Sequence, residues 1–132
     1  MGKYKYVRAD VYRRGITIFI GTRKELLYFV KEGWPDNRDL SDTVAEDLEK
    51  DNALGTTYVE DDGQSIIWIP RFPKNAKDIG VLAHEILHAT FTLLDYVDVE
   101  YMYGGPNEPY TYLFEMFLTK ALNERGYKKF EM

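Results

Sequence analysis

Hydrophobic and polar positions divide the chain into short segments with the periods of strands and helices. Residues 4–12 (YKYVRADVY) roughly alternate between apolar and polar side chains, and residues 16–20 (ITIFI) are all β-branched or aromatic. Alternation is typical of a half-exposed strand, and a short apolar run is typical of a buried one. Residues 56–60 (TTYVE) and 65–69 (SIIWI) flank the turn sequence DDGQ, so they predict a hairpin.

Four segments carry helix signals. Thr22 and Glu25 form a T-x-x-E capping box, which predicts that a helix begins there. Asn75 with Asp78 resembles a second such box. The expected helices cover approximately residues 22–32, 42–50, 76–97 and 107–125. This order predicts an α+β fold in a single domain, residues 1–132, with a small, mostly antiparallel or mixed sheet packed on the helices.

Composition narrows the class of protein. The chain has 132 residues, of which 45% are hydrophobic, a net charge of −5 and a pI near 5.1. Nucleic-acid-binding proteins usually present a basic surface, so we expect no nucleic-acid partner. No apolar run approaches the ~20 residues that span a bilayer, and the N-terminal sequence has no apolar signal segment. We therefore expect a cytoplasmic protein without a membrane association.

The two histidines form the clearest chemical motif. Because the chain has no cysteine, a metal site would need His, Asp or Glu ligands. The only histidines, His84 and His88, lie in the stretch VLAHEILHAT, with Glu85 beside the first. In a chain of this composition the arrangement would arise by accident about once in a thousand cases. It is the HExxH pattern, in which two histidines hold Zn²⁺ and the glutamate is the general base.

The helical period places the motif away from the expected core. Residues four apart are neighbours on a helix, so both imidazoles can reach one ion. The competing interpretation is an ordinary solvated helix face. The expected core stripe, on the opposite side, consists of Ile79, Leu82, Ile86, Leu93 and Val97.

A catalytic zinc site needs a third protein ligand, which must here be a carboxylate. Asp95 is on the histidine side but about 10 Å further along the helix, too far to share the ion. The next helix offers Glu108 and Glu115, which are also about 10 Å apart, so only one is expected to bind. We favour Glu108 and keep Glu115 as the alternative ligand or, like Tyr112, as a hydrogen-bonding partner of the ligands. Both glutamates could instead be unremarkable surface carboxylates.

Residues 56–122 resemble the gluzincin branch of the zincin metallopeptidases. HEILH (84–88) matches their first motif, and Asn107-Glu108 matches the NE of their second motif at the spacing of thermolysin-like enzymes. The family's aspartate four residues later is replaced by Tyr112. The run EPYTYLFE, with glutamates seven apart, is similar to a helix of the phage-immunity and stress-response peptidases that cleave repressors. The chain looks like a small phage- or prophage-encoded member.

This resemblance implies zinc-dependent hydrolysis of a peptide bond in a protein or peptide substrate. His84, His88 and Glu108 would bind Zn²⁺, and Glu85 would take a proton from the zinc-bound water and pass it to the leaving amine. In zincins the strand before this helix is the sheet edge that pairs with substrate, and SIIWI could be that strand or, equally, a buried core strand. The candidates for stabilising the oxyanion are Tyr101, Tyr103, Tyr110 and Tyr112.

Two interpretations from other classes remain open. One is a non-catalytic metal-binding or host-interaction protein with a degenerate zincin fold, and the other is a metal-free structural protein. A metal-dependent nuclease is disfavoured because the chain is acidic and lacks the third histidine of the HExxHxxxxxH pattern. The sequence identifies neither the substrate nor the oligomeric state.

Overall fold

The computed structural model describes residues 2–50 and 52–132. Its strands are β1 (Gly2–Ala9), β2 (Arg14–Ile20), β3 (Thr56–Val59), β4 (Ser65–Ile69) and β5 (Lys128–Phe130). Its helices are α1 (Arg23–Gly33), α2 (Arg38–Lys50), α3 (Ala76–Tyr96) and α4 (Glu108–Leu122), with a 3-10 turn, η1 (Asp10–Tyr12). The predicted α+β class is confirmed. Each helix in this part of the chain is too short or too polar to cross a membrane.

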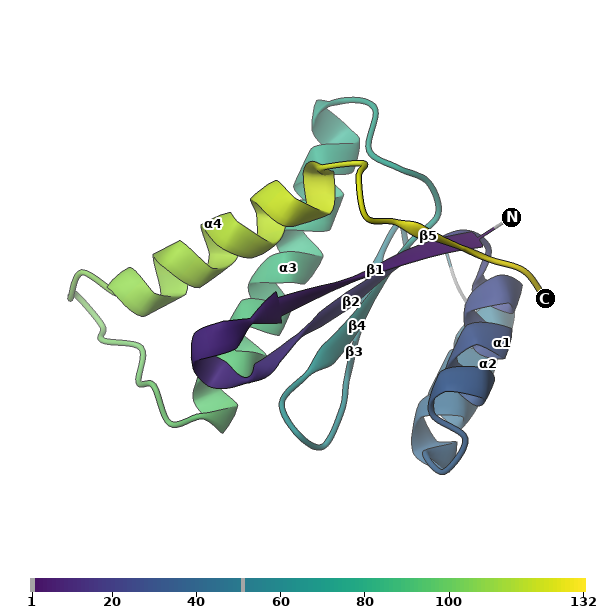
Figure 1. The fold of residues 1–132 in the computed structure, drawn as a ribbon, viewed down its shortest axis with the longest axis horizontal. Coiled ribbons are helices and arrows are strands. Elements are labelled where there is room, and N and C mark those ends of the chain that lie inside the picture. Colours follow the sequence, from purple (N-terminus) through teal and green to yellow (C-terminus); the bar gives the residue numbers. More distant parts are fainter. Residues whose placement is uncertain (1, 51) are drawn as a thin grey trace.

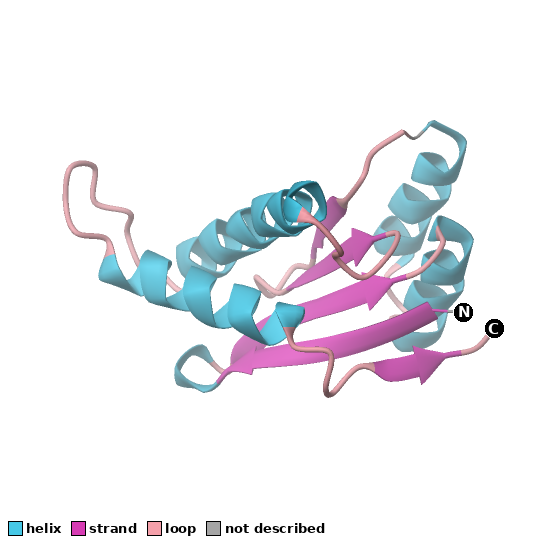
Figure 2. Ribbon diagram, turned by 90° about the horizontal axis from the view of Figure 1, so that it is seen from above, coloured by secondary structure: helices cyan, strands magenta, loops and turns pink. Residues whose placement is uncertain are grey.

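The strands form one mixed sheet in the order β3-β4-β2-β1-β5. β2 and β4 are parallel, with Ile18 opposite Ile67, and the other neighbouring pairs are antiparallel. β3 and β5 are therefore the outer strands. α3 and α4 cover one face of the sheet, and α1 and α2 cover the other (Figure 1 and Figure 2).

Alternate side chains of the central strands supply two separate cores. In β2, Ile18 and Ile20 pack toward α3 and α4, whereas Phe19 packs toward α1 and α2. β4 repeats the pattern, with Ile67 on the first side and Trp68 on the second. Strands covered on both faces are apolar along nearly their whole length, which explains the nearly continuous apolar runs in the sequence.

The helix starts predicted from Thr22 and Asn75 are confirmed, with one difference in detail. The Thr22 hydroxyl accepts from the Glu25 amide at 3.1 Å, and the Glu25 carboxylate accepts from the Thr22 amide at 2.9 Å, a complete capping box. The Asn75 side chain accepts from the Asp78 amide at 2.9 Å. The Asp78 carboxylate instead accepts from the Lys74 amide at 3.1 Å, so this second cap is not reciprocal.

Two element boundaries and one additional strand are the main differences from the sequence prediction. The first strand ends at Ala9 rather than residue 12, because η1 and the left-handed Arg13 turn the chain back to pair β1 with β2. α2 begins four residues earlier than expected, where the Asn37 side chain accepts from the Leu40 amide at 3.1 Å. β5 was not predicted, and its three residues are held by pairing with β1.

The proposed edge position of SIIWI is wrong, and its alternative as a core strand is confirmed. β4 lies between β3 and β2, and all five of its residues are buried. The outer place belongs to β3, the preceding strand of the hairpin.

Candidate functional site

α3 presents His84 and His88 on its solvent side, opposite the core. The buried residues on the other side include Leu82, Ile86, Ala89, Leu93 and Leu94. The expected core stripe is confirmed in the middle of the helix. It is wrong at Ile79, which is 39% exposed, because the core covers α3 only from Leu82 onward. Val97, just after the helix, is half-buried.

The two imidazoles meet through their Nε2 atoms. These atoms are 3.2 Å apart, and the ring planes are inclined by 83°. Two tetrahedral ligands with Zn–N distances of about 2.0–2.1 Å are roughly 3.3 Å apart, so the pair could hold one ion with little adjustment. Without an ion, the same contact is a hydrogen bond between a protonated and an unprotonated ring nitrogen.

Glu85 is buried between α3 and the outer strand β3, with 8% of its surface exposed. Its Oε1 accepts a 2.9 Å hydrogen bond from the Thr57 hydroxyl, and its Oε2 lies 4.0 Å from His84 Nε2. Thr57 Oγ1 also lies 3.1 Å from the Glu85 carbonyl oxygen, so the hydroxyl is fixed against this turn of α3. One carboxylate oxygen is therefore held by the strand while the other lies on the histidine side.

Gly55, just before β3, allows the close approach of this strand to α3. A Cβ at this position would lie 2.9 Å from Val81 Cγ1 and 3.2 Å from Glu85 Cγ, which is closer than ordinary packing. Neither Gly55 nor Thr57 stands out in the sequence as a site residue. Both act through the docking of β3 on α3, and no local pattern in the sequence encodes that docking.

The structure does not bring the expected third metal ligand, Glu108 or Glu115, to the two histidines. Among residues 2–50 and 52–132, no group of three His, Asp or Glu side chains is arranged to hold a metal. Tyr110 anchors the first turn of α4 to α3, with its ring centroid 4.9 Å from that of Phe91. Glu108, two residues earlier, is exposed and lines a separate open hollow with η1 and Tyr112. Glu115 is also exposed.

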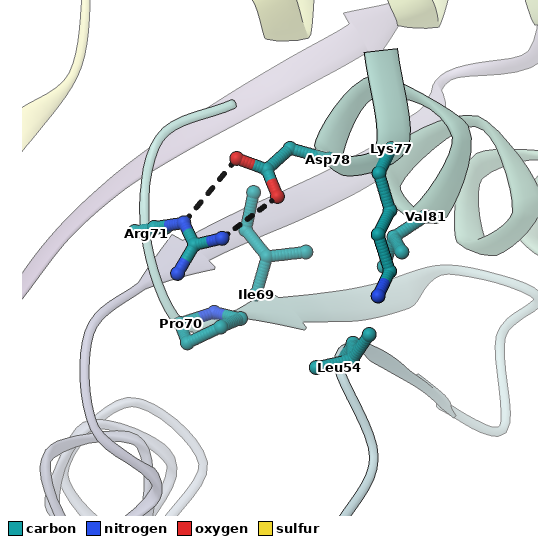
Figure 3. Close-up of a pocket in the computed structure, with 7 residues that line it drawn as sticks. All are labelled: Leu54, Ile69, Pro70, Arg71, Lys77, Asp78 and Val81. Carbon is teal, nitrogen blue, oxygen red and sulfur yellow. Dashed lines mark hydrogen bonds and ion pairs between the residues drawn. The ribbon is translucent and has the colours of Figure 1, made fainter. Parts of the chain in front are cut away.

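An apolar hollow of about 90 Å³ lies beside the first turns of α3 (Figure 3). Its apolar wall consists of Leu54, Ile69, Pro70 and Val81. Arg71 donates to the Asp78 carboxylate at 3.1 and 3.2 Å, which holds the pKa of Asp78 below its usual value. Lys77 extends along the other side of the hollow in Figure 3. Val81 is about one turn before His84, so this hollow adjoins the motif.

The four candidate tyrosines occupy different environments. Tyr110 is buried and donates a 2.5 Å hydrogen bond to the Val99 carbonyl, and burial raises the pKa of its hydroxyl. Tyr103 is fully exposed, and Tyr112 belongs to the Glu108 hollow. Tyr101 is half-exposed and packs on Phe91. Phe91 lies about one helical turn after His88 on α3. Of the four, Tyr101 combines exposure with a place beside the motif.

Comparisons with known proteins give no family for the chain. No protein-family model, curated protein or solved structure matches it significantly. The function must therefore be inferred from the chain's own residues, above all from His84, Glu85, His88 and Thr57.

Proposed function

We propose that the chain is a zinc-dependent peptidase in which His84 and His88 hold the metal and Glu85 is the general base. One observation carries this proposal: a buried carboxylate lies beside two exposed imidazoles whose Nε2 atoms are 3.2 Å apart. Burying a carboxylate is unfavourable unless other groups stabilise it, and the Thr57 hydroxyl does so here. An ordinary solvated helix face would not require this arrangement.

The chemistry divides between the metal and the protein. When bound, Zn²⁺ would polarise the scissile carbonyl and lower the pKa of a water toward ~7. Glu85 would accept the proton of the attacking water and return it to the leaving amine. The hydrogen bond from Thr57 to Oε1 fixes the carboxylate so that Oε2 is the oxygen available for this transfer.

The third ligand would come from α4, with Glu108 as the proposed ligand and Glu115 as the alternative. Both are exposed and separate from the histidines in the structure. Completion of the site therefore requires a rearrangement of these side chains or of the first turn of α4 when metal binds.

A peptide substrate would bind along β3. β3 is an outer strand, and the side that faces away from β4 has no strand partner in the described chain. An extended peptide can add to such an edge through main-chain hydrogen bonds. Thr57 belongs to this strand and contacts the general base, so a peptide paired with β3 would lie near Glu85.

A non-catalytic metal-binding protein is the second candidate. It is favoured by the separation of the α4 glutamates from the histidine pair among the described residues. The two functions differ in their dependence on Glu85, which is required for hydrolysis but is not a proposed metal ligand.

Elemental analysis after incubation with zinc sulfate and gel filtration tests the metal site. We expect nearly one zinc per chain in the wild type and in Glu85→Gln, and loss of zinc in His84→Ala and Glu108→Ala. Zinc lost in Glu115→Ala but kept in Glu108→Ala would move the third ligand to Glu115. A wild-type protein that takes up no zinc would overturn the proposal.

Cleavage of a defined peptide mixture, followed by mass spectrometry, tests the reaction. We expect new fragments with the wild type and none with Glu85→Gln that retains its zinc. Zinc-loaded wild type that leaves every peptide intact, as Glu85→Gln does, would favour the non-catalytic function.

A further inference from the structure

An open hollow of about 480 Å³ lies beyond His88 along α3. Its lining residues are Phe91, Thr92, Asp95, Glu100, Tyr101 and Tyr110. Phe91 and Asp95 lie about 4.5 and 10 Å beyond His88 along the helix axis. An extended peptide advances about 3.3 Å per residue, so the hollow is one to three residues from a bond held at the histidines.

Three aromatic rings form one wall of this hollow. The centroid of Phe91 is 5.3 Å from that of Tyr101 and 4.9 Å from that of Tyr110. Tyr110 is 6% exposed, and its hydroxyl is bonded to the Val99 carbonyl, so it anchors the cluster. Phe91 and Tyr101 are 39% and 50% exposed and leave aromatic surface available to a ligand.

Two carboxylates give the hollow a negative charge. Asp95 and Glu100 are both exposed, and no Lys or Arg of the described chain lies within ion-pair distance of either. Both line the hollow together with Tyr110, and their charges contribute, after burial itself, to the raised pKa of the Tyr110 hydroxyl. Aromatic faces attract cations, and carboxylates bind ammonium and guanidinium groups. A neutral apolar side chain would use only the rings.

We propose that this hollow is a subsite for a lysine or arginine side chain of the peptide held at the histidines. Its role in cleavage rests on the proposed function, whereas binding of the side chain requires no zinc. The hollow at the other end of the motif is bordered by Lys77 and by the Arg71–Asp78 pair, and its wall is apolar. A basic residue is therefore expected only on the Asp95 side, which would give the bound peptide a direction.

NMR titration of the zinc-free chain tests the subsite directly. The probes are N-acetyl-lysine methylamide and its uncharged counterpart, N-acetyl-norleucine methylamide. We expect the lysine compound to shift the amide signals of residues 91–101 and Tyr110 saturably, and to bind at least about fivefold more tightly than the norleucine compound. The double variant Asp95→Asn/Glu100→Gln should lose this preference.

Matched controls separate the subsite from general charge and from the metal site. Asp42→Asn/Glu46→Gln makes the same charge change on α2, on the other face of the sheet, and should bind the lysine compound as the wild type does. His84→Ala/His88→Ala should also bind it unchanged. A dispersed NMR spectrum shows that each variant is folded.

The outcomes for the two proposals are distinct. Equal binding of the two compounds, or shifts centred outside the hollow, would overturn the subsite whether or not the chain binds zinc. Zinc-dependent cleavage without a preference for lysine or arginine beside the cleaved bond would also overturn it, while leaving the peptidase proposal intact. If the chain binds the lysine compound selectively but takes up no zinc, the result would support the subsite proposal and overturn the peptidase proposal.

Discussion

The hydroxyl of Thr57 on β3 donates a 2.9 Å hydrogen bond to the carboxylate of Glu85 on α3. These residues are 28 positions apart in the sequence, and their contact joins the outer strand of the sheet to the HExxH helix. The strand that a peptide would pair with therefore also positions the proposed general base. A displacement of β3 would be transmitted to Glu85 through this bond.

If the chain hydrolyses peptides as proposed, replacing Thr57 by valine should impair catalysis without removing the metal. Valine has a similar shape but no hydroxyl, so Glu85 Oε1 loses its partner. We expect kcat/KM to fall by about tenfold or more, a magnitude typical of lost supporting hydrogen bonds, and the zinc content to stay unchanged. Steady-state kinetics and elemental analysis measure the two effects. Thr57→Ser, which keeps the hydroxyl, should recover most of the activity; equal activity in Thr57→Val would contradict the role.

Gly55→Ala should destabilise the protein, whereas Gly80→Ala should not. The added Cβ at Gly55 would lie 2.9 Å from Val81 and 3.2 Å from Glu85, while nothing lies within 4 Å of a Cβ at Gly80. Forced overpacking costs about 1–3 kcal/mol, and alanine for glycine inside a helix gains roughly 0.5–1 kcal/mol. Urea unfolding measures both changes. A Gly55→Ala variant as stable as the wild type would show that β3 can move away from α3 without cost.

The sequence predicted the strands and helices well where the signal is local. The ITIFI and SIIWI runs are buried strands, and the capping box of Thr22 starts α1 where expected. β5 was not predicted because its sequence, KKF, is short and mostly charged. It forms a strand because it pairs with β1. The parallel pairing of β2 with β4 is likewise a property of the assembled sheet.

In the candidate site, too, the sequence predicted the local features but not those that depend on tertiary packing. The spacing of His84 and His88 and the period of the helix were enough to predict that the pair lies together and away from the core. The hydrogen bond of Glu85 depends on how a strand docks against the helix. The position of Glu108 depends on the loop before α4, in which the left-handed Asn107 accepts from the Met102 amide at 2.6 Å. Local patterns carry neither of these relationships.

Lys5→Met should loosen the attachment of α4 to the sheet. The Lys5 ammonium donates to three backbone carbonyls at and beyond the end of α4, those of Lys120, Asn123 and Arg125, at 2.7, 3.0 and 2.6 Å. Hydrogen bonds from a charged group contribute about 1.5–3 kcal/mol, so we expect a loss of roughly this size in the free energy of unfolding. Lys129→Met, at an exposed position of β5, is the control and should unfold nearly as the wild type does. Indistinguishable denaturation midpoints for the two variants would show that water replaces Lys5 at these carbonyls.

The capping box of α1 should make stability depend on pH in the acid range. The Thr22 backbone amide donates to the Glu25 carboxylate, which lowers its pKa below the ordinary value of 4.5. A carboxyl whose pKa is lower in the folded chain stabilises it at pH values above the unfolded pKa, and this contribution is lost as the pH falls through the folded pKa. Glu25→Gln can keep the hydrogen bond but cannot titrate. The wild type should therefore be more stable than Glu25→Gln at pH 6, and the difference should shrink steadily toward pH 3.

Urea unfolding across this pH range measures the difference in stability. Glu49→Gln, at an exposed position of α2, is the control for the loss of one negative charge. A difference between wild type and Glu25→Gln that is constant from pH 6 to pH 3 would show that the carboxylate charge does not stabilise the start of α1.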